Sequence, residues 1–454
     1  MMIEDLLPVL MFAALGLLLF TGYPVAFVLG GVALGFAGLG MAYDVFVPLQ
    51  LFNLLPRIWG GIAENLILTA VPMFIFMGTM LEKSGVATDL LHCLQVLLRR
   101  VPGGLALSVT VMGTVMAATT GIIGASVVMM TLLALPVMMQ QKYSHELSTG
   151  TIAASGTLGI LIPPSIMLVV MADLLAKSVG NLFFAALFPG LLLSGMYFVY
   201  IFTVSRIKPS LAPPLPRDIG PESALALVLL VARSFLPPVF LIFLVLGSIL
   251  FGWATPTEAA GVGAAGATLL AILRGKLTFR VLKEVVERSA LTGGMLFMIF
   301  LCATAFSYVF RALGGDDVVI GTVEAAELTS WGILVAVMVL VFILGFFFDW
   351  IEITLIVLPV FTPIIELLDF GDHVMKKDVV YWFAILLAVN LQTSFLTPPF
   401  GFALFYMKGV APPALKMIEV YRGIIPFVIL QIIGLGAVMA FPDIAMWLPN
   451  TVLD

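Results

Sequence analysis

Long apolar stretches, separated by short polar segments, run through almost the whole chain. A stretch of about 20 apolar residues is long enough to cross a membrane as a helix. The pattern predicts ten such spans, some of them short and two of them interrupted by proline. They are Leu6–Phe20, Pro24–Ala42, Ile62–Leu81, Thr151–Leu175, Leu182–Val204, Phe235–Phe251, Glu258–Leu273, Ala290–Phe310, Tyr381–Met407 and Ile424–Trp447. We therefore expect an all-α polytopic membrane protein.

Two further regions, 104–141 and 332–368, each contain two apolar legs joined by a short polar break. The break is Thr119–Ser126 in the first region and Asp349–Glu352 in the second. Each region is either two ordinary helices or one re-entrant hairpin. Because acidic side chains inside an apolar stretch are tolerated at a water-lined site in mid-membrane, we expect two re-entrant hairpins.

Two of the predicted spans carry a double proline at the same place. Pro163–Pro164 interrupts the span 151–175, Pro398–Pro399 interrupts the span 381–407, and the residues around the two pairs align. Proline removes a helical hydrogen bond and clashes with the preceding turn, so both helices should unwind there. Unwound backbone is tolerated at that depth only where it is buried in protein or lines a polar cavity. A repeated pair of broken helices is typical of secondary transporters.

The proline-rich segment 209–222 is the one plausible linker, and it divides the chain into two similar halves. Residues 1–208 and 223–454 each run through three spans, one hairpin, one broken span and one final span. An odd number of passes precedes the linker, so the second half is predicted to be inverted relative to the first. We expect a binding site at the interface of these two inverted repeats.

Basic residues are distributed unevenly over the two sides of this arrangement. Sixteen of the 21 fall on the side of the linker, which should be cytoplasmic, and both termini should then face outward. The outer side receives Arg57, Lys177, Arg311, Lys376 and Lys377. Segments 85–100 and 277–287 place leucine or valine at helical spacing between basic residues, which predicts interfacial helices along the cytoplasmic face.

The composition also indicates a membrane protein, and it argues against several other functions. Apolar residues make up 62% and charged residues 10% of the chain, against about 25% charged residues in soluble domains. The net charge of −5 implies no nucleic-acid surface. A polytopic membrane enzyme would need His, Asp or Cys clustered at one depth, whereas the three histidines lie outside the predicted spans. A channel is disfavoured, because broken helices in inverted halves favour alternating access.

The four backbone breaks, two hairpin tips and two unwound spans, form the candidate site. Unwound carbonyls and side-chain oxygens suit a small hard cation, and the N-terminal ends of half-helices suit a carboxylate. The predicted cation ligands are Ser155, Gly156, Thr157, Asp349, Asn390, Thr393 and Thr397. The predicted substrate contacts are Thr120, Ser126, Ser165, Thr397 and Phe400. The alternative for each small residue is close helix packing, with hydroxyls bonded back to their own helix.

Four segments together resemble a known family. They are Pro72–Gly78, Leu158–Ser165, Ala254–Ala260 and Thr397–Gly401, and they resemble the large membrane subunit of tripartite ATP-independent periplasmic (TRAP) transporters over essentially the whole chain. The resemblance implies a sodium-driven importer of organic acids in the inner (cytoplasmic) membrane of bacteria or archaea, with an elevator fold and Na+ as the coupling ion. It also implies two partners, a small four-helix membrane subunit and a periplasmic substrate-binding protein.

Two segments depart from the commonest family pattern. The first hairpin tip, Thr119–Ser126, stands where the family is often Ser-rich, and Asn390–Ser394 stands where many members carry glycine. The segment Asn390–Ser394, together with Phe348–Glu352, looks like the branch of the family labelled for mannitol or chloroaromatic compounds. We expect a small carboxylate, such as a 2-oxo or aromatic acid, rather than a polyol. The alternative is a stand-alone ion-coupled carboxylate transporter or antiporter of related architecture, which needs no binding protein.

The predicted orientation can be tested with single cysteines in a chain whose two native cysteines are replaced. A cysteine at Ser210, in the linker, should react with an impermeant thiol reagent only after the cells are permeabilised, because basic-rich segments stay in the cytoplasm. A cysteine at Lys376, on the predicted outer side, should react in intact cells. Labelling of the Ser210 position from outside would refute this topology.

Overall fold

The structure is a computed structural model that describes residues 3–120, 123–215, 219–221, 223–325, 327–398 and 401–452. Within these ranges it contains twenty α-helices and six short 3-10 or π turns, and no strand. Eight of the helices are long and apolar enough to cross a membrane, or nine spans if one bent pair is counted as a single span. The predicted all-α fold is confirmed.

The first half contains ten helices and four short turns. They are α1 (Ile3–Leu19), α2 (Val25–Ala42), η1 (Pro48–Asn53), α3 (Leu54–Ile58), η2 (Trp59–Ala63), η3 (Ile67–Thr69), α4 (Ala70–Lys83), α5 (Val86–Leu98), α6 (Gly104–Thr120), α7 (Ile123–Gln140), α8 (His145–Thr157), η4 (Leu158–Ile160), α9 (Ile166–Leu174) and α10 (Val179–Ile207). The turn η5 (Pro209–Leu211) opens the linker.

The second half repeats much of this order. Its elements are α11 (Ala224–Leu250), α12 (Pro256–Leu273), α13 (Phe279–Ala312), α14 (Gly315–Ala325), α15 (Ser330–Leu344), α16 (Trp350–Leu367), η6 (Gly371–His373), α17 (Val379–Ser394), α18 (Phe402–Val410), α19 (Met417–Ala440) and α20 (Asp443–Val452). In each half, a pair of neighbouring helices (α6 and α7, or α15 and α16) precedes an interrupted helix (α8 and α9, or α17 and α18).

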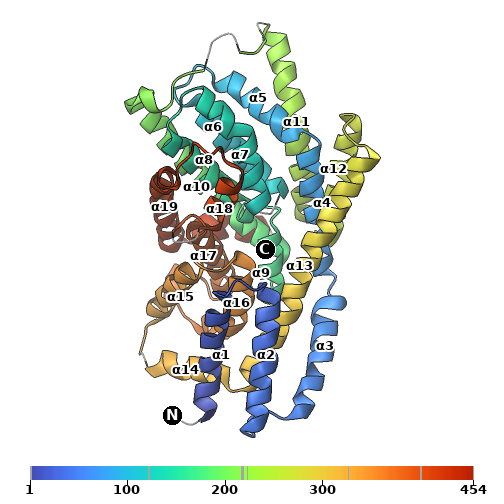
Figure 1. Cartoon of the computed structure of the whole chain (residues 1–454), viewed down its shortest axis with the longest axis vertical. Coiled ribbons are helices and arrows are strands. Elements are labelled where there is room, and N and C mark those ends of the chain that lie inside the picture. Colours follow the sequence, from blue (N-terminus) through green and yellow to red (C-terminus); the bar gives the residue numbers. More distant parts are fainter. Residues whose placement is uncertain are drawn as a thin grey trace.

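Packing between elements follows the same correspondence. Helix α2 packs on α13 as α12 packs on α4, and α9 contacts α16 as α18 contacts α7. Figure 1 shows α6 and α7 in the upper part of the molecule and α15 and α16 in the lower part, with α2, α3, α4, α12 and α13 along one side. The inverted relation of the halves stays a prediction from the span count.

Two sequence predictions need correction. The expected span Ile62–Leu81 is the second arm of a bent pair, 48–63 and 67–83, whose arms make an angle of 56°. Asn65 stabilises the bend, because its Oδ1 accepts from the Ile67 N–H at 3.0 Å and its Nδ2 donates to the Gly61 carbonyl at 3.2 Å. The prediction of a separate interfacial helix over 277–287 is wrong, because α13 runs from Phe279 without a proline into the predicted span 290–310.

Another double proline inside a long apolar stretch, Pro237–Pro238, does not end its helix: α11 runs through it to Leu250. The carbonyl of Arg233 lies four residues before Pro237, so proline deprives it of its helical partner. Arg274 supplies a replacement, with Nη2 donating to the Arg233 oxygen at 3.3 Å. A double proline therefore interrupts a helix only where the surroundings accept the unwound backbone.

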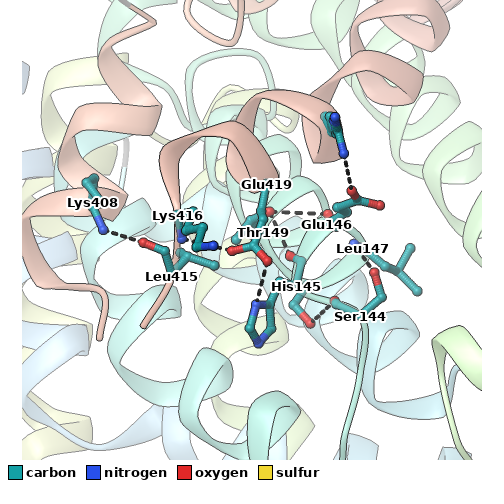
Figure 2. Close-up of polar contacts among 11 residues, drawn as sticks. Ser144, His145, Glu146, Leu147, Thr149, Lys408, Leu415, Lys416 and Glu419 are labelled. Carbon is teal, nitrogen blue, oxygen red and sulfur yellow. Dashed lines mark hydrogen bonds and ion pairs between the residues drawn. The ribbon is translucent and has the colours of Figure 1, made fainter. Parts of the chain in front are cut away.

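The backbones of the two halves touch where α8 crosses α19. A side chain added at Gly150 would overlap the carbonyl of Gly423, and one added at Gly423 would overlap the carbonyl of Glu146. Figure 2 shows the polar contacts beside this crossing, including His145 Nδ1 at 3.1 Å from Glu419 Oε1. The two glycines let the backbones touch, as small residues do between membrane helices.

We predict that Gly150→Ala or Gly423→Ala lowers stability by about 1–3 kcal/mol, because an added methyl forces the α8 and α19 backbones apart. Thermal unfolding of the purified protein measures the effect. Gly436→Ala on α19 is the matched control, since nothing lies within 4 Å of its added methyl. A Gly423→Ala protein as stable as the Gly436→Ala protein would contradict this account of the crossing.

Candidate functional site

The first interrupted helix contacts the first hairpin at its tip. Helix α8 ends at Thr157 and α9 begins at Ile166. The Ile160 carbonyl, deprived of its partner by Pro164, accepts a hydrogen bond from Ser165 Oγ at 2.6 Å. A methyl added at Gly159 would lie 3.7 Å from Ser126 Oγ. Ser165 therefore closes the unwound segment, and Ser126 lies against it.

The second interrupted helix makes the corresponding contact with the second hairpin. Helix α17 ends at Ser394 and α18 begins at Phe402, after Gly401 with a left-handed φ of +53°. A methyl added at Gly345, just after α15, would overlap Ser394 Oγ. Glycine is needed at position 345 for this close approach. Each hairpin thus packs on the break of its own half.

The two breaks also contact each other. Gln392 Nε2 donates to Thr157 Oγ1 at 3.4 Å, and both side chains are fully buried. The Thr157 hydroxyl in turn donates to the Ala154 carbonyl at 2.9 Å. The other amide atom, Gln392 Oε1, is buried and has no hydrogen-bond partner within the described ranges. Burying an oxygen acceptor without a donor costs free energy, and a bound cation would remove that cost by coordinating the oxygen.

The other predicted cation residues of the first half lie on helix surfaces. Ser155 Oγ is 3.5 Å from Thr110 Oγ1, where α8 packs on α6. A methyl added at Gly156 would be 2.5 Å from Val127 Cγ2, so Gly156 permits the close packing of α8 on α7. Thr157 is the one of the three predicted residues that reaches the second half through a hydrogen bond recorded among the described residues.

The predicted cation ligands of the second half are more widely spread. Asn390 Nδ2 donates to the Met338 carbonyl at 2.6 Å, which ties α17 to α15. The hydroxyls of Thr393 and Thr397 bond back to Val389 and Thr393 at 3.2 and 2.9 Å. Of the predicted substrate contacts, the Thr120 side chain and Phe400 lie outside the described residues. The assignments of ligands stay predictions.

Asp349 and Glu352 form the tip of the second hairpin. Asp349 caps α16, accepting from the Trp350 N–H at 2.7 Å, and its own N–H donates to Glu352 Oε2 at 3.1 Å. This reciprocal pair satisfies two backbone donors at a buried helix start. The acidic tip predicted to contact a ligand therefore also holds the hairpin in shape.

One cavity of about 340 Å³ is lined by both hairpin tips and, opposite them, by α4 and α13. The first tip contributes Gly124 and Ala125, and the second contributes Asp349 and Trp350. Across from them lie Arg288 and Thr292 of α13, and Tyr406 of α18 covers Gly124. We call this space the tip cavity. Ser126, Ser165 and Thr397 do not belong to its lining as far as the structure describes it.

Sequence reasoning missed four polar residues of the tip cavity: Thr79, Arg288, Thr292 and Tyr406. Thr79 and Thr292 are isolated hydroxyls inside predicted spans, which is a weak signal. Arg288 was counted as one more cytoplasmic charge, and it pairs with Glu82 at 3.2 Å. Their common location depends on the packing of α4 and α13 against the hairpins.

Comparisons with known proteins agree on one family. Residues 12–444 match the model of the tripartite ATP-independent periplasmic transporter, DctM component. The chain is 31% identical to the C4-dicarboxylate TRAP transporter large permease protein DctM of Pseudomonas aeruginosa, covering 86% of this chain and 87% of that protein. It is 27% identical to the ectoine TRAP transporter large permease protein TeaC of Halomonas elongata, over 95% and 96% of the two chains.

A third relative is the isethionate TRAP transporter permease protein DctMQ of Oleidesulfovibrio alaskensis, 28% identical over 98% of this chain and 66% of that protein. Among solved structures, the YdaH transporter of Alcanivorax borkumensis shares the fold with a TM-score of 0.60 at 13% identity, over 86% and 88% of the two chains. The match along residues 12–444 decides the family. This chain belongs to the DctM components, the large permease subunits, of the tripartite ATP-independent periplasmic transporters.

Proposed function

We propose that this subunit imports a small organic acid across the inner membrane, coupled to sodium, after a periplasmic binding protein delivers it. The tip cavity carries the proposal, because elements of both halves converge there on one space that holds an arginine and hydroxyl-bearing side chains. A small four-helix membrane subunit would complete the complex. These partners are proposed from the family, whose relatives are named as TRAP permeases.

We propose that the coupling ion binds where the two interrupted helices meet, beside Thr157 and Gln392. Neutral amide and hydroxyl oxygens are ligands that hard cations accept, and Gln392 Oε1 is a buried acceptor in need of a partner there. Thr157 Oγ1 and the unwound carbonyls lie on the same breaks. Sodium would hold the two halves together at this point, and its binding would favour the closed packing of both hairpins.

For the substrate we propose the tip cavity. A carboxylate or sulfonate would be held by Arg288, Thr292 and the N–H groups at the starts of the half-helices. The names of the relatives include C4-dicarboxylate, ectoine and isethionate. The branch labelled for mannitol or chloroaromatic compounds remains a prediction from the second break, and a small carboxylate remains our choice over a polyol.

We further propose an elevator motion. The hairpins and interrupted helices would move as one body against α2, α4, α12 and α13, which pack on one another along one side of the molecule (Figure 1). The extensive α8–α19 and α7–α8 packing favours a rigid moving body. Such a motion would expose the tip cavity alternately to the two sides.

The test is uptake into proteoliposomes that contain the chain and its small subunit. Under an inward sodium gradient and with the cognate binding protein, we expect accumulation of one among succinate, isethionate, ectoine, pyruvate and benzoate. Uptake that persists without the binding protein would support the stand-alone transporter instead. Uptake that is indifferent to replacing sodium with choline would exclude sodium coupling.

We predict that Gln392→Leu abolishes stabilisation by sodium, because it removes the orphaned oxygen at nearly constant volume. In the native chain, sodium at ten times its dissociation constant should raise stability by about 1.4 kcal/mol over choline, measured by thermal unfolding. Gln431→Leu is the matched control. Gln431 is also buried, and its Oε1 has no partner among the residues that the structure describes, but its Nε2 donates to Tyr197 between α19 and α10. Equal sodium effects in both variants would remove Gln392 from the site.

A further inference from the structure

A second cavity, of about 330 Å³, lies on the far part of α13 from the tip cavity. Its walls are α3, the end of α9, α13 and the second leg of the second hairpin, α16. Four hydroxyl-bearing residues line it: Thr304, Ser307 and Tyr308 on α13, and Thr362 on α16. Arg57, Arg311 and Glu366 complete the polar lining. We call this space the arginine cavity.

Several basic side chains lie at or beside this cavity. The sequence places five basic residues on the outer side of the membrane, and Arg57 and Arg311 both line this one space. A third, Lys177, lies 3.7 Å from Glu366, which is the acidic residue in the lining. The lining therefore has two positive charges and one negative charge that is itself paired. Low-dielectric walls strengthen the field of such a group of charges.

Contacts with the protein hold both guanidinium groups in place. The Arg57 guanidinium lies 4.8 Å above the ring of Tyr308, whose hydroxyl accepts from Asn53 at 3.2 Å. Arg311 Nη2 donates to the Pro359 carbonyl at 2.5 Å, an oxygen deprived of its helical partner by Pro363. Arg311 Nε also lies 3.7 Å from Asp316. Each guanidinium carries five N–H donors, more than these contacts engage, so an anion can bind to groups that are already oriented.

An apolar section of α13 separates the two cavities. Ile299 and Phe300 are buried between Thr292, in the tip cavity, and Thr304, in the arginine cavity. At a rise of about 1.5 Å per residue, Arg288 and Arg311 lie about 35 Å apart along the helix, close to the thickness of a bilayer. The arginine cavity is therefore a separate place on the predicted periplasmic side, and an ion there does not reach the hairpin tips.

We propose that the arginine cavity is an entry site for the transported anion, a small carboxylate or sulfonate that binds between Arg57 and Arg311 before it reaches the tip cavity. This rests on the proposed import of an organic acid. Arg57 on α3 and Arg311 on α13 form one part of the site and α16 of the second hairpin forms another, so movement of that hairpin would open the site and pass the anion on. The positive charges would hold the anion that the binding protein releases and so raise the concentration of this anion near the transporter, as charged clefts do for their ligands.

The test measures the charge preference of the cavity without relying on transport. Ser307→Cys is placed in a chain with Cys93 and Cys302 replaced, and the purified protein reacts with anionic and cationic methanethiosulfonates of similar size. Rates are divided by those of a small free thiol. We expect the anionic reagent to be preferred. Arg57→Gln or Arg311→Gln should each lower the rate with the anionic reagent about fivefold, as for unit charges about 4 Å apart in water, and should raise the rate with the cationic reagent, so the preference falls.

Three controls separate charge from packing. Arg311→Lys keeps the charge and should keep most of the preference, even if it weakens the contact with Pro359. Arg280→Gln removes an exposed arginine from α13 outside both cavities and should change nothing. Thr292→Cys, in the tip cavity, should show a preference that is insensitive to Arg311→Gln.

Succinate at millimolar concentration should also slow labelling of the Ser307→Cys chain by the anionic reagent. A charge preference that neither glutamine variant alters overturns the inference, whatever the uptake assay gives. A preference that both variants reduce supports an anion site even if uptake of the tested acids fails, so the two proposals fail separately.

Discussion

Every backbone carbonyl buried in a membrane needs a hydrogen-bond donor, and prolines in the helices of this chain repeatedly remove the usual one. At several of these prolines a particular side chain replaces the lost donor. Ser165 donates to Ile160 where Pro164 interrupts α8 and α9, and Arg311 donates to Pro359 where Pro363 lies in α16. Leaving such oxygens unpaired would cost several kcal/mol each. The shapes of the breaks therefore depend on these donors.

Close backbone contact is the second requirement, and glycines meet it. Gly150 and Gly423 bring α8 and α19 together, and Gly345 brings the second hairpin onto Ser394. Little hydrophobic force drives helices together in lipid, so packing of this kind carries much of the association. The result is one body in which hairpins from one half contact interrupted helices of both halves. That body brings Thr157 and Gln392 to a common point.

In the proposed mechanism, the tip cavity and the arginine cavity each have some walls that stay fixed and others that move. Helix α13 lines both cavities, one beside Arg288 and one beside Arg311. With α4 in the first cavity and α3 in the second, it is joined by elements of the hairpins and interrupted helices. An arginine at each end of one helix suits an anion that travels along it. The buried apolar residues between the ends, Ile299 and Phe300, separate the two spaces and so suit alternating access.

The sequence by itself determined the all-helical membrane class, because long apolar runs have few other solutions, and it located both interruptions, because Pro163 and Pro398 fall inside such runs. It also proposed Thr157 and Asp349. Tertiary structure decided the rest. Thr157 and Gln392 are 235 positions apart, and no local pattern marks a contact of that kind. The continuation of α11 through Pro237 depended on Arg274 from another helix. Which polar residues share a cavity depends on how helices cross, and the crossing is set by side-chain volumes from both halves at once.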